Sequence, residues 1–286
     1  MKIWDQAIAD DLLDVHEREW LSKYEAVDCP PVEDIWAVMD TVWHEMELNN
    51  RAKLDNDMLS AYYSHPVWTL NGLYTEADEV SSSHRKAIAQ FINKYKLKHG
   101  ADYGGGFGTL AQQITDLCPI CKIDIIEPYP SKIALDRVKN YDRINFVSES
   151  DGPYDFIIAQ DVLEHVENPI DLTSKLINML KPGGFAFFAN CFYPVIQCHL
   201  PSTFHLRHTF KWVVAPIGIE YIGGVPGAEH TLVFRKNEQA EDTSATRNRE
   251  KIALQFGGLL NGFFEFLTKV KSLMKIPLSM KKPSNR

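Results

Sequence analysis

The sequence has no long uncharged apolar run and few cysteines. No window approaches the roughly 18 consecutive apolar residues of a membrane-spanning helix. The first residues carry no secretory apolar segment, because acidic side chains begin at Asp5. The five cysteines are an odd number without the spacing of a disulfide framework. We therefore expect a cytoplasmic chain with reduced thiols, whose contact with membranes is at most peripheral.

An excess of basic residues is also lacking. The net charge is −8, which argues against general nucleic-acid binding because phosphate neutralisation needs clustered Lys and Arg. The charge is uneven along the chain. Residues 1–50 hold thirteen Asp and Glu against three Lys and Arg, whereas residues 251–286 hold seven Lys and Arg against one Glu. We expect no nucleic-acid partner, and two chain ends of opposite charge.

Two nucleotide-binding signatures are missing, but a different glycine loop is present. No loop ends in Gly-Lys-Ser/Thr, and Thr109 stands where a dinucleotide fingerprint has its third glycine. The loop Asp102-Tyr103-Gly104-Gly105-Gly106-Phe107-Gly108 is followed nineteen residues later by Glu127. Glycines allow a sharp turn that leaves room for a ligand, and an acidic residue after the next strand suits ribose hydroxyls. The pair indicates a nucleoside cofactor, although a purely structural turn uses the same glycines.

Apolar periodicity predicts alternating strands and helices after a helical N-terminal region. Apolar residues recur at helical spacing over residues 1–63, and Ser81–His84 is typical of the start of a helix ending near residue 95. The expected core elements are strand 101–104, helix 108–117, strand 122–127, helix 130–140, strands 144–148 and 155–160, helix 169–180, strand 184–190, helix 209–217 and strands 219–222 and 231–234. This alternation is typical of a parallel sheet with helices on both faces.

We therefore expect an α/β fold, with a doubly wound, mostly parallel seven-stranded sheet of Rossmann-like type closed by an antiparallel hairpin. The expected parts are a helical N-terminal extension or lid (1–80), a cofactor-binding domain (81–236), a polar linker (237–250) and a basic amphipathic C-terminal helix (251–286). Aromatic residues between 61 and 79 either fold over the mouth of the site or pack the helices against the sheet.

The glycine loop resembles the first motif of the class I S-adenosylmethionine-dependent methyltransferases. Tyr154–Val166 is similar to the fourth strand and following helix of that family, and Leu180–Phe185 to the turn into its fifth strand. His205–Phe210 resembles the start of a late helix in its small-molecule members. The resemblance covers roughly residues 84 to 236. Segment 94–101 is less apolar than the usual first strand, so we expect that strand to be short.

The resemblance implies S-adenosylmethionine as the cofactor. The residues implied to bind it are Asp102, Gly104, Gly106, Gly108, Glu127, Glu149, Gln160 and Asp161. In that scheme the loop backs the amino-acid end of the cofactor, and Glu127 holds the ribose hydroxyls. Glu149, or Ser148 beside it, meets the adenine amine. Gln160 and Asp161 face the sulfonium, whose positive charge favours an ionised carboxylate.

Methyl transfer is a direct displacement, so the enzyme must align the acceptor atom with the sulfonium methyl group. A hydroxyl acceptor also loses a proton, for which His is the commonest base. His165 and Asp161 are the candidate catalytic residues. Segment 193–210 is the expected substrate pocket, with His199, His205, Arg207 and His208. The implied function is methylation of a small molecule or a glycan, at oxygen in the first place.

Other features of the sequence allow other interpretations. Cys118 and Cys121 lack a second cysteine pair, so we interpret them as packing residues. A second cluster has the residue types of a zinc site, Cys198, His199, His205 and His208. The resemblance already explains two of these histidines, so we expect no metal. A non-catalytic module remains an alternative. An N-, protein or RNA methyltransferase is another, although the Asn/Asp-Pro-Pro-aromatic signature of amino methylation is missing after Gln160.

The C-terminal segment is unusually apolar over residues 251–276, and basic side chains run through its end. These are Lys269, Lys271, Lys275, Lys281, Lys282 and Arg286. Such a segment can lie in the headgroup region of an anionic membrane. It can also dock on the acidic N-terminal helices of the same chain or of a homodimer mate. We favour docking, because Gly257, Gly258 and Gly262 weaken an isolated helix.

Overall fold

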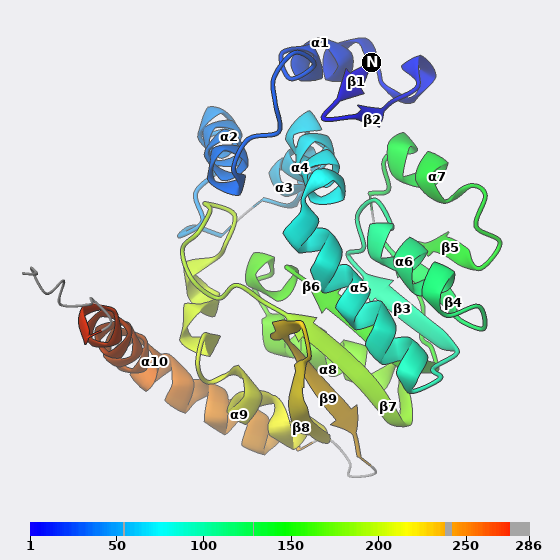
Figure 1. Cartoon of the computed structure of the whole chain (residues 1–286). Coiled ribbons are helices and arrows are strands. Elements are labelled where there is room, and N and C mark those ends of the chain that lie inside the picture. The colour runs from blue at the N-terminus through cyan, green and yellow to red at the C-terminus, as the bar shows by residue number, and fades with distance from the viewer. Residues whose placement is uncertain (54, 128, 238–241, 275–286) are drawn as a thin grey trace, which may run out of the picture.

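The computed structural model describes residues 1–53, 55–127, 129–237 and 242–274. Its centre is a seven-stranded sheet with the order β5-β4-β3-β6-β7-β9-β8 (Figure 1). Strands β3 to β7 are parallel, whereas β9 is antiparallel to both β7 and β8. The expected doubly wound α/β sheet with its closing hairpin is therefore confirmed.

The strands are β3 His99–Tyr103, β4 Lys122–Ile126, β5 Ile144–Val147, β6 Tyr154–Gln160, β7 Leu180–Ala189, β8 Ile219–Val225 and β9 Ala228–Lys236. The helices are α5 Glu79–Lys94, α6 Thr109–Leu117, α7 Lys132–Val138, α8 Pro169–Asn178, α9 Phe210–Val214 and α10 Thr243–Met274, with short 3-10 helices η2 Leu163–His165, η3 Pro201–Leu206 and η4 Ala215–Ile217. Helix α5 begins before the predicted serines, because the Asp78 carboxylate caps it by accepting from the Ser81 amide.

The direction of winding changes between β3 and β6. The chain passes from β3 outward to β4 and β5, and then returns to build β6 and β7 on the other side. In open α/β sheets ligands bind at this switch point, at the carboxyl ends of the strands. The glycine loop directly follows β3 and Asp161 directly follows β6. Two of the predicted site segments therefore flank the switch point.

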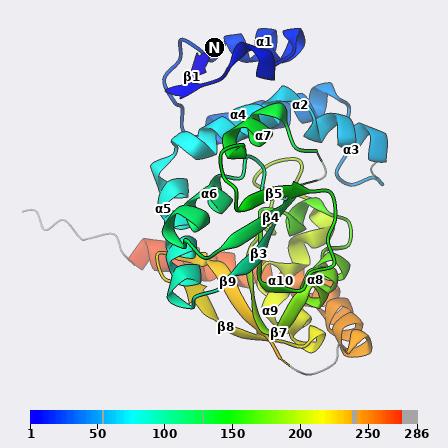
Figure 2. The same cartoon turned by 90° about the vertical axis from the view of Figure 1, so that its right-hand side faces the viewer.

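Helices cover both faces of the sheet. Helices α5 and α6 pack on one face, and α8, α9 and α10 on the other (Figure 2). Strand β6 is therefore apolar on both sides, with Phe156 facing one cluster and Ile157 the other. Gly100 on β3 makes room for the Phe156 ring, because a Cβ there would lie 2.2 Å from a ring atom.

The N-terminal region is not helical throughout. Strands β1 Lys2–Ile3 and β2 Gln6–Ala7 form a hairpin. The helical expectation was wrong for residues 1–14, where the buried Ile3, Ile8 and Leu13 are five apart and do not fit a 3.6-residue repeat. The short η1 Asp10–Leu12 is the one helical turn there. Helices then follow as α1 Val15–Ser22, α2 Val32–Glu45, α3 Asn56–Tyr63 and α4 Pro66–Ala77.

The glycine loop and the N-terminal helices share one apolar cluster. Phe107 of the loop is 8% exposed and belongs to the cluster built by α2, α3 and α4. Gly72 of α4 permits this contact, because a Cβ there would lie 2.8 Å from the Phe107 ring. Of the aromatic residues whose place was left open, Tyr62 packs on Trp43 inside this region, with ring centroids 5.0 Å apart. The helical region therefore packs directly on the loop that follows β3.

Helix α10 begins earlier than the sequence suggested. The expected linker over 237–250 was wrong for residues 243–250, which are helical. The Asp242 carboxylate caps the helix by accepting from the Ala245 amide at 2.8 Å, and Thr246 and Ala253 are buried against the domain. Residues 238–241 and 275–286 lie outside the described residues, and with them Lys275, Lys281, Lys282 and Arg286. Among the described helices none has the length and apolar content to cross a bilayer.

Helix α10 packs on η3, α9 and η4. Its Gly257 lies against His205, where a Cβ would be 2.8 Å from the histidine Cα. The N-terminal helices lie at the opposite end of the molecule (Figure 1). The expectation that α10 docks on the acidic helices of the same chain was therefore wrong. The helix packs instead on η3, α9 and η4.

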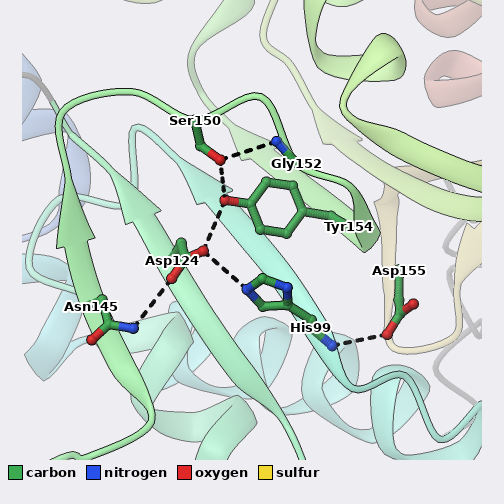
Figure 3. Close-up of polar contacts among 7 residues, drawn as sticks. All are labelled: His99, Asp124, Asn145, Ser150, Gly152, Tyr154 and Asp155. Atoms are coloured by element: carbon green, nitrogen blue, oxygen red, sulfur yellow. Dashed lines mark hydrogen bonds and ion pairs between the residues drawn. The ribbon is translucent and has the colours of Figure 1, made fainter.

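A polar cluster joins four strands towards their amino ends (Figure 3). Asp124 of β4 accepts from the Tyr154 hydroxyl of β6 at 2.9 Å and from the Asn145 amide of β5 at 3.3 Å. The Nε2 atom of His99 on β3 lies 3.0 Å from the same carboxylate. This cluster fixes the relative positions of the four strands, whose other ends carry the site.

Candidate active site

The glycine loop needs backbone conformations that other residues rarely adopt. Gly104, Gly106 and Gly108 have φ values of 69°, 52° and 74°, all in the left-handed region. Two of them are also enclosed, because a Cβ would lie 2.8 Å from Val162 at Gly104 and 2.7 Å from Ile125 at Gly108. At Gly106 a Cβ would meet nothing within 4 Å. Gly106 is thus the point of the loop that borders open space.

Two carboxylates, those of Asp102 and Glu127, lie next to this loop. Asp102 is 3% exposed, and its Oδ2 atom has no hydrogen-bond partner among the described residues. Burial and the nearby Glu127 carboxylate raise the pKa of Asp102 to about 7. Burial also raises the pKa of Glu127, although hydrogen bonds from the Tyr129 and Gly106 amides oppose this. Glu127 therefore stands next to the glycine that borders open space.

We expect Asp102 to make the stability of the ligand-free protein fall as pH rises. The folded protein holds the Asp102 proton up to about pH 7, whereas an unfolded chain releases it near the ordinary aspartate pKa of 3.8. Between these values the folded state binds more protons, so its free energy of unfolding decreases with rising pH. The Asp102→Asn variant lacks this loss. Its free energy of unfolding relative to the wild type should therefore rise by at least about 1 kcal/mol between pH 4 and pH 7. Thermal melts of both proteins measure the difference, and parallel profiles would refute it.

The other predicted cofactor residues lie along the same edge of the sheet. Ser148 and Glu149 follow β5 and are both exposed, and Gln160 ends β6 half-buried. Asp161 follows with φ of 50°, and its amide donates to the Ala189 carbonyl of β7 at 2.8 Å. The Asp161 side chain is reached by solvent, yet the protein around it raises the pKa of its carboxyl.

Three residues lie close together after Asp161. His165 and His199 were predicted site residues, whereas Glu164 was not. The ring of His165 lies 4.9 Å, between centroids, from the ring of His199. Glu164, which directly precedes His165, is fully buried, and its Oε1 accepts from the Cys191 amide at 2.6 Å. Burial and, to a smaller extent, the nearby His199 lower the pKa of His165 to about 3. Both histidines are therefore neutral at physiological pH.

The remaining expected pocket residues do not join this group. His205 is buried beneath α10, and His208 stacks on Phe264 of that helix at 4.4 Å between centroids. Arg207 donates to Glu265 at 2.8 Å, and its guanidinium lies 4.6 Å from the Tyr193 ring centroid. The reason is that η3 and the residues directly after it pack against α10, so these side chains contact that helix.

Sequence reasoning left open whether the aromatic residues of segment 61–79 reach the site, and two of them lie against His165. The rings of Tyr63 and Trp68 lie edge-on to it, with centroids 6.4 and 6.2 Å away. They come from α3 and the first turn of α4, about a hundred residues earlier in the chain. Their clustering before the cofactor domain was the available signal, but periodicity does not say which ring faces the site. Glu164 was missed because a Glu-His pair is frequent at this place in the resembled family.

Comparisons with known proteins agree with this geometry. Residues 83–216 match the family model described as a methyltransferase domain. The ubiquinone biosynthesis O-methyltransferase of Erwinia tasmaniensis is 27% identical over 210 residues, which cover 68% of this chain and 81% of that protein. The protein of the same description from Pectobacterium carotovorum subsp. carotovorum is 26% identical over 197 residues, covering 64% and 76%.

Solved structures support the fold. An O-methyltransferase family protein from Burkholderia thailandensis superposes with a TM-score of 0.53 at 14% identity, covering 78% of this chain and 77% of that one. The family model spans the glycine loop and the β6 segment, which are the two segments that flank the switch point. Residues 83–216 therefore form a class I S-adenosylmethionine-dependent methyltransferase domain, and S-adenosylmethionine is its cofactor.

Proposed function

We propose that this enzyme transfers the methyl group to an oxygen atom of a small molecule. The observation that carries the proposal is the position of the cluster around His165, which lies directly after the strand that ends beside the glycine loop. The relatives whose names specify O-methylation support oxygen as the acceptor atom. The partly exposed aromatic side chains beside His165 support an acceptor with apolar surface.

The proposed reaction is a single displacement. The acceptor oxygen forms a bond to the methyl carbon while the carbon–sulfur bond breaks, and both electrons of that bond remain on sulfur. The acceptor hydroxyl gives up its proton to a neighbouring group or to water. Asp161 is the accessible carboxylate on the cofactor side, and in the proposed arrangement it faces the sulfonium. Glu127 holds the ribose, and Ser148 or Glu149 meets the adenine.

Binding and turnover test this proposal separately. Calorimetric titration of the folded chain with S-adenosylhomocysteine should give one site per chain. Labelled S-adenosylmethionine, offered with a panel of hydroxylated and amino acceptors, should label hydroxylated ones. Cofactor binding without transfer to any acceptor would favour the non-catalytic module. Labelling confined to amines, proteins or RNA would contradict O-methylation.

We propose in addition that the exposed side of α10 contacts a second copy of the chain. Eight of its apolar side chains are exposed: Ile252, Leu254, Phe256, Leu259, Leu260, Phe263, Phe264 and Phe266. Apolar surface of this extent on one helix commonly marks an interaction site. Docking on its own acidic helices is not seen, so the acidic helices of a dimer mate remain available to it.

The double substitution Phe263→Glu with Phe266→Glu should abolish this association. Both side chains are more than half exposed, so the folded monomer loses little and the contact gains two buried charges. Light scattering should give a dimer for the wild type and a monomer for the variant. Ile120→Glu, at a position 53% exposed between α6 and β4 and outside both proposed surfaces, is the control and should remain dimeric. A monomeric wild type that floats with anionic vesicles would replace the dimer by a membrane contact.

A further inference from the structure

Three potential metal ligands converge after β6. Glu164 and His165 belong to η2, and His199 comes from the segment between β7 and η3. One possible ligand atom from each residue lies within 4.8 Å of the others. The sequence expectation of no metal considered only the neighbours of His199 in the chain, and the fold supplies different partners from more than thirty residues away.

The two histidines are oriented by backbone carbonyls. The Nδ1 atom of His165 lies 3.0 Å from the Cys198 carbonyl oxygen, and that of His199 lies 3.0 Å from the Tyr193 carbonyl oxygen. A carbonyl only accepts, so each Nδ1 carries the hydrogen and each Nε2 keeps a lone pair. Metal-binding histidines have this outer contact, because it fixes the tautomer and the ring orientation.

Only one of the two oxygens of the Glu164 carboxylate has a hydrogen-bond partner. Glu164 is 0% exposed, and its Oε2 atom has no hydrogen-bond partner among the described residues. A buried polar oxygen without a partner is costly, and more so when it is ionised. Among the described residues no Lys or Arg side chain is paired with this carboxyl group. A bound cation would supply both the missing partner and the missing charge.

We propose that Glu164, His165 and His199 bind a divalent transition-metal ion, Zn²⁺ in the first place. Two imidazoles and one carboxylate suit Zn²⁺ better than Mg²⁺ or Ca²⁺, which prefer oxygen ligands. The aromatic rings of Tyr63 and Trp68 form an apolar wall beside His165, and such a shell is usual around metal sites. His165 is half-buried, whereas Glu164 and His199 are buried, so the ion would enter past His165.

Three protein ligands leave a fourth position free, as in catalytic zinc sites. With respect to the reaction, the inference rests on the proposed function, because it gives the ion the task of orienting the acceptor oxygen. His165 then acts as a ligand and not as the general base. The proton of the acceptor hydroxyl passes to water, which the exposed Asp161 side chain contacts.

Cobalt titration of the full-length, tag-free chain tests the site. After a chelator has removed bound metal, Co²⁺ is added while the visible absorption is recorded, and Zn²⁺ is then added as competitor. We expect one equivalent of Co²⁺ per chain, displaced by Zn²⁺. Glu164→Gln keeps the shape of the side chain and its contact with Cys191, and His199→Gln removes one imidazole. Each should weaken binding by at least roughly 100-fold, since even outer-shell changes cost 10- to 100-fold.

A matched control separates this site from incidental histidine binding. His84→Ala breaks the other close histidine pair, His84 and His230, whose ring centroids are 4.5 Å apart. It should retain wild-type cobalt affinity. Thermal melts and titration with S-adenosylhomocysteine show that each variant is folded. The inference is overturned if the folded wild type binds no stoichiometric Co²⁺, or if both site variants bind as the wild type does. Stoichiometric metal binding without methyl transfer would contradict the proposed function and leave the metal site standing.

Discussion

Gly106→Ala should weaken cofactor binding by roughly 10- to 100-fold while the domain stays folded. The added methyl group meets no protein atom within 4 Å, so it projects into the space that we assign to the cofactor. Inserting a methyl group into space that another molecule fills costs about 1–3 kcal/mol. The left-handed backbone at this residue adds roughly 1 kcal/mol to the folding cost alone. Calorimetry with S-adenosylhomocysteine measures the first effect and thermal melting the second.

Gly183→Ala is the matched control for this change. Gly183 has φ of 77°, and its nearest neighbour to an added Cβ is an Arg235 side-chain atom at 3.6 Å. It lies in the first half of β7, away from the carboxyl edge of the sheet. The two variants should lose similar stability, but only Gly106→Ala should lose affinity. Equal affinities in both variants would place the cofactor away from this loop.

Glu127→Ala should weaken cofactor binding by roughly 1–3 kcal/mol, from the loss of charge-assisted hydrogen bonds to the ribose. Glu127→Gln should lose less, because it keeps one acceptor oxygen for the ribose and the Tyr129 amide. S-adenosylhomocysteine titration measures both. Glu229→Ala removes an acidic side chain that contacts the Gly227 amide in the β8–β9 turn, and it should bind as the wild type does. Unchanged affinity in Glu127→Ala would mean that the ribose lies elsewhere.

The sequence predicted the sheet because local and global signals agree there. Buried parallel strands read as short apolar runs, and β6 and β7 are continuous runs of this kind between clear turn residues. The glycine loop could be placed for a related reason. Its positive φ angles favour glycine, so the glycines in the sequence indicate the backbone conformation of the loop.

The acceptor side could not be predicted in the same way. His199 meets His165 only because the segment after β7 folds back across η2, where the Leu200 amide donates to the Glu164 carbonyl. Hydrophobic periodicity predicts helices and strands, but it does not predict a contact between two connecting segments. His205 and His208 looked equivalent to His199 in the sequence, yet both contact α10, His205 from η3 and His208 from the turn after it. The hairpin at the N-terminus was missed for a similar reason, since its two-residue strands are too short to show alternation.

The seating of Phe107 against Gly72 makes the glycine loop and the N-terminal helices a single thermodynamic unit. Opening of α4 would expose the Phe107 ring and release the loop from one side. A ligand that binds only the closed loop must therefore raise the free energy of that opening, by an amount set by its concentration relative to its dissociation constant. Amide hydrogens of α4, which holds none of the proposed cofactor-binding residues, should then exchange more slowly as S-adenosylhomocysteine is added. The stability of the N-terminal helices, which border the proposed acceptor site, would therefore depend on whether the cofactor is bound.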